Sequence, residues 1–499
     1  MPANDGEPGL RCRIQKEVGQ RWIVDLARRK QLAPWVVSKS ETAEQARQIA
    51  KSLFGLPQQI DVESIVRQWQ LAGHYRAVDD RRQPPPPWSP EGFEDAGESA
   101  WRQLSTQLTQ TETTAALSCY VHLPFCDRKC GFCDCYSVFI PPGNNDRQEH
   151  YFQALIQEIE LWSQFTNLGA RPLTTVHLGG GTPTYLPAEL LERLIDSLKN
   201  CFGHTPSTEW ALESTTSQLS PENLQHLKTL GFTRLHIGVQ SLDQRIRKII
   251  GRQEPTEQVL QKIVLALDYG FVVTSDLIFG LPGQKQESFI HDIQQLIDLG
   301  IDGCSLYHLN ESLRNQTFLN QVSGSFESPF QNYLSFHIGE QLLRVHGYEK
   351  THFAHFSRPR DRNLYYRHVV RNEDLLALGT TADGSFGDYS YRHPPLAEYQ
   401  NLLQQRQMPL QGGLRESVTA IVTRPLSASL MAGYATLTTF QNLNADSLRI
   451  RWLDYGLIEE SNVKDRYVLT ANGSWYLSHL LTELHCHAME QGLQPSSTS

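Results

Sequence analysis

The feature that most constrains the fold is a repeated alternation of short β-type runs with longer amphipathic segments between about residues 119 and 310. Runs rich in β-branched and aromatic residues predict strands, and apolar residues at three- and four-residue spacing predict the helices between them. Serial strand–helix units are typical of parallel strands joined by right-handed crossovers. The strand candidates are 119–124, 174–180, 209–214, 234–239, 272–280 and 302–309. Six such units predict an α/β fold with a partial (β/α)6 barrel rather than a closed eightfold one.

The rest of the chain divides around this barrel. Residues 1–115 are predicted to be an N-terminal accessory region, with a helix near 36–56 and a Pro-rich linker around Pro84–Pro87. The barrel is expected over 116–312. An extension over 313–395, with a helix near 333–346 and a turn-rich remainder, would complete the substrate pocket. A helix, two strands and a last helix over 396–499 predict a helical, winged-helix-like module.

Composition excludes several classes of protein. The 499 residues are 39% apolar, and 45 Lys and Arg against 54 Asp and Glu give a net charge of −9, so no basic field invites nucleic acid. No apolar run approaches the roughly 20 residues of a membrane span, and the first ten residues lack a basic, apolar leader. A cytoplasmic location is therefore expected. The nine cysteines are odd in number and four crowd into ten residues, which argues against a disulfide framework.

Those four cysteines form the strongest chemical signal. Cys126, Cys130, Cys133 and Cys135 make a CxxxCxxCxC array directly after the first predicted strand. Thiolates are soft ligands that suit iron–sulfur clusters and zinc. Three thiolates on one loop can hold three corners of a cubane and leave one iron open. A structural zinc site closed by Cys135 is the alternative that the residues leave open.

The array and its setting resemble the cluster loop of radical S-adenosylmethionine (SAM) enzymes, in the branch of the oxygen-independent coproporphyrinogen III oxidases and related heme chaperones. The resemblance covers about residues 117–390. It is carried, in family order, by Tyr120–Cys126 (YVHLPFC), His177–Thr184 (HLGGGTPT), Gly238–Ser241 (GVQS), Asp276–Gln284 (DLIFGLPGQ) and Ser305–Leu309 (SLYHL). Five patterns in register indicate common ancestry more strongly than any one of them.

The resemblance implies the cofactors and their residues. Cys126, Cys130 and Cys133 would ligate a [4Fe-4S] cluster whose fourth iron binds SAM, and one electron would cleave SAM to methionine and a 5'-deoxyadenosyl radical. It also implies a second SAM beside the first. The residues implied around the first SAM are Tyr120, Phe132, Gly180, Gly181, Thr182 and Glu213, and those around the second are Gln240, Arg252 and Asp276. Loop packing for Phe132, a solvated strand end for Glu213 and an ordinary surface position for Arg252 are the alternatives.

The leading activity that the resemblance implies is oxidative decarboxylation of a porphyrinogen propionate, as in the oxidases. Cys135 favours an oxidase, and Arg362 stands where the chaperones usually carry histidine. Two departures favour a radical C-methyltransferase or cyclopropanase instead. The first 115 residues lack the Tyr-rich pattern expected ahead of an oxidase barrel, and the run Cys133–Ser137 resembles enzymes that transfer the methyl group of the second SAM. A heme chaperone is the non-enzymatic alternative.

The expected partners are an anionic tetrapyrrole and an electron donor such as flavodoxin or ferredoxin. Asn310 and residues 375–384 are candidates for the substrate pocket. A local group of arginines is either a solvated face or a site for substrate carboxylates: Arg358, Arg360, Arg362, Arg367 and Arg371. His352 and His355 are predicted to be packing or surface residues, with binding of a metal or a planar ligand as the alternative.

Overall fold

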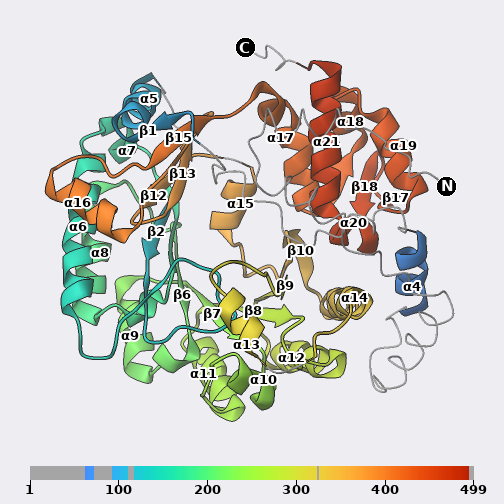
Figure 1. Ribbon diagram of the computed structural model, residues 1–499, viewed down its shortest axis with the longest axis horizontal. Helices are drawn as coiled ribbons and strands as arrows, with labels where there is room; N and C mark the ends of the chain where they lie inside the picture. Colours follow the sequence, from blue (N-terminus) through green and yellow to red (C-terminus); the bar gives the residue numbers. More distant parts are fainter. Residues whose placement is uncertain (1–61, 72–92, 111–116, 323–324, 372, 494–499) are drawn as a thin grey trace.

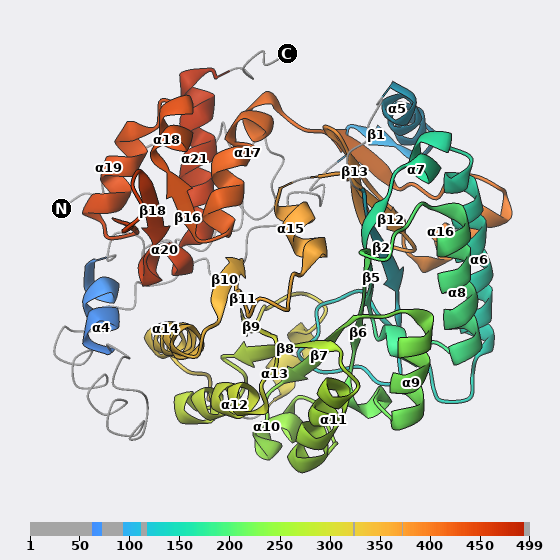
Figure 2. The same cartoon turned by 180° about the vertical axis from the view of Figure 1, so that it is seen from behind.

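The structure is a computed structural model that describes residues 62–71, 93–110, 117–322, 325–371 and 373–493. The predicted helix near 36–56 and the Pro-rich linker lie outside these residues. Figure 1 and Figure 2 show a curved sheet with helices along its outer side and a separate group of helices at the C-terminal end.

The sheet contains all six predicted parallel strands in sequence order. Their bounds are Leu117–Leu123 (β2), Leu173–Gly180 (β5), Glu209–Ser214 (β6), Arg234–Gln240 (β7), Val272–Phe279 (β8) and Gly303–His308 (β9). No strand boundary differs from its predicted position by more than two residues. The largest difference is at the first strand, which begins at Leu117 and not at Cys119. All neighbouring pairs among them are parallel. Their carboxyl ends therefore meet at one edge, where active sites of such folds collect.

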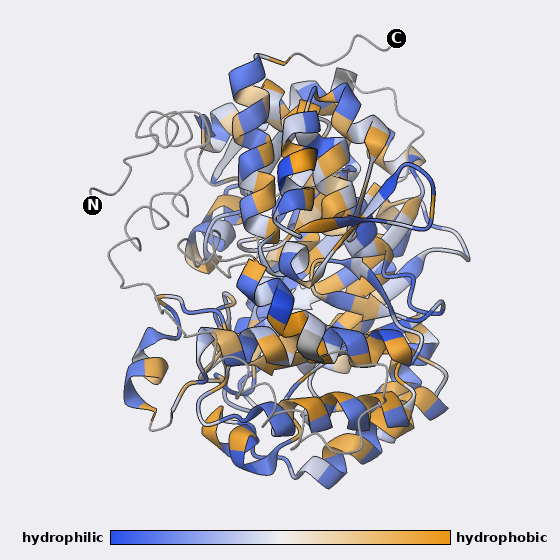
Figure 3. Cartoon of the chain, turned by 90° about the vertical axis from the view of Figure 1, so that its right-hand side faces the viewer, coloured by the Kyte–Doolittle hydropathy of each residue, from blue (hydrophilic) through white to orange (hydrophobic). Residues whose placement is uncertain are grey.

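Amphipathic helices cover the outside of the sheet. In α8 the buried residues recur at three- and four-residue spacing from Leu190 to Leu198, and this apolar stripe faces the strands. Figure 3 shows apolar and polar residues alternating along such helices. The helices of this layer are Asp146–Ser163 (α6), Thr166–Ala170 (α7), Ala188–Cys201 (α8), Pro221–Leu230 (α9), Gln244–Ile249 (α10), Thr256–Asp268 (α11), Gln286–Leu299 (α12) and Pro329–Val345 (α14). Two short 3₁₀ turns follow β5 and β6, at Pro183–Tyr185 (η2) and Thr216–Gln218 (η3).

The sheet continues past the barrel strands on both sides, and within the described residues it has thirteen strands. Beyond β9 lie β11 and β10, and beyond β2 lies β12, parallel to it, followed by an antiparallel group. The added strands are Asp95–Ala96 (β1), Glu349–His352 (β10), His355–Ser357 (β11), Leu375–Leu378 (β12), Asp383–Phe386 (β13), Tyr389–Arg392 (β14) and Gly412–Arg415 (β15). The stretch predicted to be turn-rich thus contains short strands. Helix Gly97–Gln110 (α5) packs on β14 and β15, and helix Leu396–Gln404 (α16) packs on α6.

One short helix lies inside the curve of the sheet. Helix α15 (Leu364–Val370) contacts β2 and β5 on one side and β10 on the other. Tyr365 stacks on both Tyr120 and His177, with ring centroids 5.5 and 4.6 Å away. The next residue, Tyr366, stacks on His352 at 4.6 Å. Successive residues of one helix therefore pack against opposite walls of the barrel.

The C-terminal module begins with Val418–Met431 (α17) and has its own three-stranded sheet in the order β16-β18-β17. Trp475 joins it to the barrel, because its ring lies within 6 Å of the rings of Tyr333 and Phe336 on α14. Helix α4 (Val62–Leu71) packs against α14 and α20 at the same junction. The remaining elements are Tyr434–Thr436 (β16), Leu437–Asn442 (α18), Asp446–Asp454 (α19), Ile458–Glu460 (β17), Arg466–Leu469 (β18), Ala471–Trp475 (α20) and Leu477–Gln491 (α21).

Candidate active site

The four cysteines of the array lie on one loop at the carboxyl end of β2. The loop starts in the two-residue strand β3 (Phe125–Cys126), which pairs with β4 (Val138–Phe139). Inside the loop the Cys133 amide donates to the Cys130 carbonyl oxygen at 3.3 Å. The Gly131 amide donates to the carbonyl oxygen of Ile250, the residue that follows α10, also at 3.3 Å. Cys126, Cys130 and Cys133 are half-buried, whereas Cys135 is exposed. Four free thiols are thus presented from one short turn.

The thiols differ in how readily they ionise. The Cys135 thiol donates a hydrogen bond to Cys133 and lowers the pKa of Cys133 to about 7. Burial raises the pKa of Cys126 to about 11, although Thr182 opposes this by donating from Oγ1 to the Cys126 sulfur at 3.6 Å. Burial also raises the pKa of Cys130, against the charge of Arg252. Since metals bind thiolates, a bound metal would displace protons that the buried thiols otherwise keep.

A segment after β9 holds the cysteine loop in place. Asn315, just before α13 (Gln316–Gln321), is 1% exposed. Its amide nitrogen donates to the carbonyl oxygens of Phe132 at 2.9 Å and Asn310 at 2.7 Å, and its Oδ1 accepts from the Ser312 amide at 2.9 Å. Arg314 donates to the Asp134 carbonyl at 2.8 Å. Asn310, predicted for the substrate pocket, instead donates to the Asp134 carboxylate within this clamp.

The glycine run after β5 packs tightly against the same loop. A Cβ on Gly181 would lie 2.6 Å from the Phe125 carbonyl oxygen, and a Cβ on Gly179 would lie 2.8 Å from Glu213 Oε1. Gly180 has a φ of 109°, in the region that favours glycine. Its amide donates to Glu213 Oε2 at 3.2 Å. The run therefore brings backbone amides beside the cysteine loop in a space that no larger residue allows.

Glu213 ends β6 in this cradle. Its Oε1 lies 3.2 Å from His177 Nε2. Burial acts against ionisation, but the hydrogen bond and charge of His177 hold the pKa of Glu213 below its ordinary value. Tyr120, on the neighbouring face of β2, hydrogen-bonds to His122 Nδ1 through its hydroxyl at 3.2 Å. The structure thus brings Tyr120, the glycine run and an ionised Glu213 together next to the cysteines.

The second group of predicted residues lies on the adjoining strands. Gln240 ends β7 with a φ of 69°, and Asp276 faces the same side from β8. Asp276 Oδ1 and Arg252 Nε are buried and have no hydrogen-bond partner within the described residues. Arg252 also lies over the Phe132 ring at 5.8 Å. Phe132 itself packs on an apolar group that includes Ile250, so the loop-packing interpretation also fits it.

Other predicted residues lie away from this edge or are engaged elsewhere. Residues 375–378 form β12, and its following turn is held by buried Glu158, which accepts from the Gly379 amide at 2.8 Å. Both histidines are buried: His355 bonds to Asp361 and Ser305, and His352 stacks on Tyr366. Among the arginines, three have partners on the protein: Arg358 over Tyr348, Arg360 with Asp302 and Arg371 with Glu373. Arg362 and Arg367 are exposed.

Two residues of the site escaped prediction. His236 on β7 lies between the two carboxylates, with Nε2 2.7 Å from Asp276 Oδ2. The alternation of the strand, which places His236 on one face with Arg234 and Gly238, was the available signal. For Asn315 no local signal exists, because Phe132, through which it holds the cysteine loop, lies 183 residues earlier in the chain.

The residues present fit an iron–sulfur cluster and a charged ligand. Within the ranges that the structure describes, no three His, Cys, Asp or Glu side chains converge on a point where a single metal ion would sit. A zinc ion would draw its ligands to within about 2.0–2.3 Å of one point. Spaced soft thiols suit the separate corners of a cluster better. The unpartnered Asp276 and Arg252 atoms, and the amides of the glycine run, are groups that a charged ligand would satisfy.

Comparison with known proteins agrees with this geometry. The family model described as the Radical SAM superfamily matches residues 120–296. The heme chaperone HemW of Bacillus subtilis is 30% identical over 300 residues, which span 58% of this chain and 77% of the chaperone. The chain belongs to the radical SAM superfamily. Within it, the chain falls in the group of coproporphyrinogen III oxidases and heme chaperones.

Two further relatives bear on what this radical SAM protein does. The anaerobilin synthase of Escherichia coli O157:H7 is 32% identical over 297 residues, 58% of this chain and 65% of the synthase. The oxygen-independent coproporphyrinogen III oxidase of Escherichia coli K12 is 28% identical over 369 residues, 70% of this chain and 78% of the oxidase. The solved structure of the Escherichia coli oxidase has the same fold, with a TM-score of 0.68 and 24% identity over 80% of this chain and 95% of that one.

These sequence matches make the protein a radical SAM enzyme that uses a [4Fe-4S] cluster and SAM. The α/β fold predicted from the sequence is confirmed, with an open parallel sheet rather than a closed barrel. None of the described helices is long and apolar enough to cross a membrane.

Proposed function

We propose that this radical SAM enzyme binds two SAM molecules and uses the radical from the first, by way of the second, to alter the ring of an anionic tetrapyrrole. The observation that carries the proposal is that two groups of ligand-binding residues adjoin at the carboxyl ends of the strands. One contains the glycine run and Glu213 beside the cysteine loop. The other contains Gln240, Arg252 and Asp276, with polar atoms that no described residue satisfies.

In this proposal Cys126, Cys130 and Cys133 hold the cluster. When bound, the cluster supplies the electron that cleaves SAM to methionine and a 5'-deoxyadenosyl radical. The Gly180 and Gly181 backbone and the ionised Glu213 would bind the polar groups of the first SAM, and Tyr120 would close the side of its site. The free oxygen of Asp276 and the guanidinium of Arg252 would bind the second.

The substrate class rests on the relatives. One makes an anaerobilin, a second is named for coproporphyrinogen and a third for heme, and all three names refer to tetrapyrroles. The exposed Arg362 and Arg367 at α15 would suit the propionate groups of such a molecule, because guanidinium groups pair with carboxylates. Electrons would come from a small acidic donor such as flavodoxin or ferredoxin.

Three observations favour attack on a ring carbon over attack on a propionate. The anaerobilin synthase is 32% identical and the oxidase 28% identical. In addition, the described residues just ahead of the barrel pair with β15 at the far edge of the sheet, where β1 meets Gly412 and Gly413, and not at the site. The sequence also lacks the Tyr-rich segment expected ahead of an oxidase barrel.

The oxidase-like decarboxylation is the second candidate. Cys135 favours it, as does the fold shared with the oxidase over 95% of that structure. A heme chaperone is less well supported, because Arg362 replaces the expected histidine and Asn363, which follows it, is 2% exposed.

The test compares two substrates under strict anaerobiosis. Reconstituted enzyme with dithionite and SAM is given heme in one arm and coproporphyrinogen III in the other. We expect 5'-deoxyadenosine and S-adenosylhomocysteine in equal amounts with heme, loss of the Soret band and a product of changed mass. Carbon dioxide from coproporphyrinogen without S-adenosylhomocysteine would favour the oxidase. A stable heme complex without 5'-deoxyadenosine, from enzyme with a verified cluster, would refute both enzyme proposals.

A further inference from the structure

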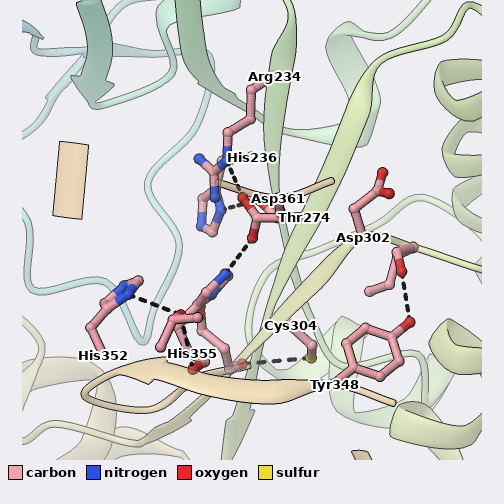
Figure 4. Close-up of polar contacts among 12 residues, drawn as sticks. Arg234, His236, Thr274, Asp302, Cys304, Tyr348, His352, His355 and Asp361 are labelled. Atoms are coloured by element: carbon pink, nitrogen blue, oxygen red, sulfur yellow. Dashed lines mark hydrogen bonds and ion pairs between the residues drawn. The ribbon is translucent and has the colours of Figure 1, made fainter. Parts of the chain in front are cut away.

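His236 occupies the boundary between the two proposed SAM sites. It is paired in register with Glu213 of β6 on one side and with Thr274 of β8 on the other. Its ring is largely buried, with 15% of the side chain exposed. No family pattern noted in the sequence assigns this residue a role. Figure 4 shows His236 beside Thr274, near the buried pair of Arg234 and Asp361.

Both ring nitrogens of His236 have partners. Nδ1 lies 2.7 Å from Thr274 Oγ1, and Nε2 lies 2.7 Å from Asp276 Oδ2. Burial acts against a charged ring, but Asp276 raises the pKa of His236 above its ordinary value. Nε2 donates to the carboxylate in the charged ring, and also in the neutral tautomer whose Nδ1 accepts from the threonine hydroxyl. One oxygen of Asp276 is then held by His236. The other, Oδ1, is buried with no partner among the described residues.

The surrounding charges make this arrangement specific. Asp276 lies on β8 and Glu213 on β6, so two carboxylates flank the imidazole, while Arg234 lies two residues away on its own strand. Arg234 is already engaged by Asp361 at 2.8 Å. Among the described residues, His236 donates the hydrogen bond that the Asp276 side chain accepts. Without the His236 ring, neither carboxylate oxygen of Asp276 would have a hydrogen bond from these residues.

We propose that His236 is a positioning residue that orients the Asp276 carboxylate toward the second SAM, with Thr274 setting the tautomer of its ring. The inference rests on the proposed two-SAM function. A fixed carboxylate loses less freedom when it binds a ligand, so the orientation appears as affinity for that ligand. The first SAM, bound through Glu213 and the glycine run, should be much less affected.

The experiment measures SAM binding by the holoenzyme without a reductant, so that no turnover occurs. Anaerobic titration calorimetry should show two SAM per chain for the native enzyme. His236→Leu should weaken the second event about tenfold or more, the scale of a lost hydrogen bond to a charged group, and change the first less than about threefold. His236→Gln, whose amide nitrogen can replace Nε2 as donor, should recover most of the loss.

Three controls separate the outcomes. His291→Asn, at an exposed histidine on α12, should bind both SAM molecules as the native enzyme does. Iron content and thermal unfolding show whether each variant keeps its cluster and fold. A native stoichiometry of one would overturn both this inference and the two-SAM proposal. Two events that His236→Leu leaves unchanged, or that His236→Gln fails to restore, would overturn this inference alone.

Discussion

The clamp built by Asn315 gives a prediction whose size can be worked out from its contacts. Asn315→Ala removes two donated hydrogen bonds, to Phe132 and Asn310, and one accepted from Ser312. Each is worth about 0.5–1.5 kcal/mol. The bond to Phe132 joins the cysteine loop directly, and the other two shape the segment that carries Asn315, so the clamp as a whole loses about 1.5–4.5 kcal/mol. Because about 1.4 kcal/mol corresponds to a factor of ten, the open form of the loop should become about ten to a thousand times more populated.

The assay is the loss of iron from the reconstituted cluster to a chelator, followed anaerobically by absorbance. We expect iron loss from Asn315→Ala to be at least about tenfold faster than from the native enzyme. The matched control is Asn223→Ala, which removes an exposed asparagine that donates to Gln218 at 2.8 Å, far from the cysteine loop. Equal rates for Asn315→Ala and the native enzyme, with both fully loaded at the start, would refute the clamp.

Three further outcomes are expected. Cys130→Ala should abolish the cluster, measured as iron and sulfide per chain, while Cys135→Ala should retain it; a colourless Cys135→Ala protein would contradict the ligand assignment. Gly181→Val should weaken SAM binding by about fivefold to a hundredfold, since overpacking costs about 1–3 kcal/mol. Because the new side chain would press on the Phe125 backbone of the cysteine loop, binding is compared at equal iron content. Burial lowers the pKa of His393, but the charge and hydrogen bond of Glu158 outweigh it and raise the pKa above its ordinary value. Native His393 therefore keeps a proton that the unfolded chain releases above about pH 6.5. The free energy of unfolding should therefore fall as the pH rises from about 6.5 toward the pKa of native His393. The melting temperature of His393→Gln should not show this fall with pH.

Much of the barrel was predictable because its strands and helices are long enough to show their full pattern of apolar residues in the sequence. Each parallel strand is buried on both faces and six to eight residues long, and each helix has a full apolar stripe. The positions of the cysteines and the glycine run were predictable for a different reason, since each follows a predicted parallel strand and such loops meet at the carboxyl edge of the sheet.

The rest depends on contacts that no local pattern records. Strands β12 to β15 have four residues each, too few to show an alternation. The side chains of Asn315 and His236 act through residues on other strands and loops, so their roles follow only from the folded register. The sequence left His352 and His355 as packing or surface residues, because turn-forming neighbours surround them, and the added strands β10 and β11 bury both.

Helix α15 also limits how a large ligand reaches the chemistry. Its tyrosines fill the space between Tyr120 and His177 on one wall and His352 on the other. In the register of the sheet, Tyr120 and His177 lie two residues before the level of Glu213. The reaction chamber consequently has an aromatic floor. A flat macrocycle would have to arrive from above, over the ends of the strands, and a reactive carbon radical would meet rings, not bulk water, on its lower side.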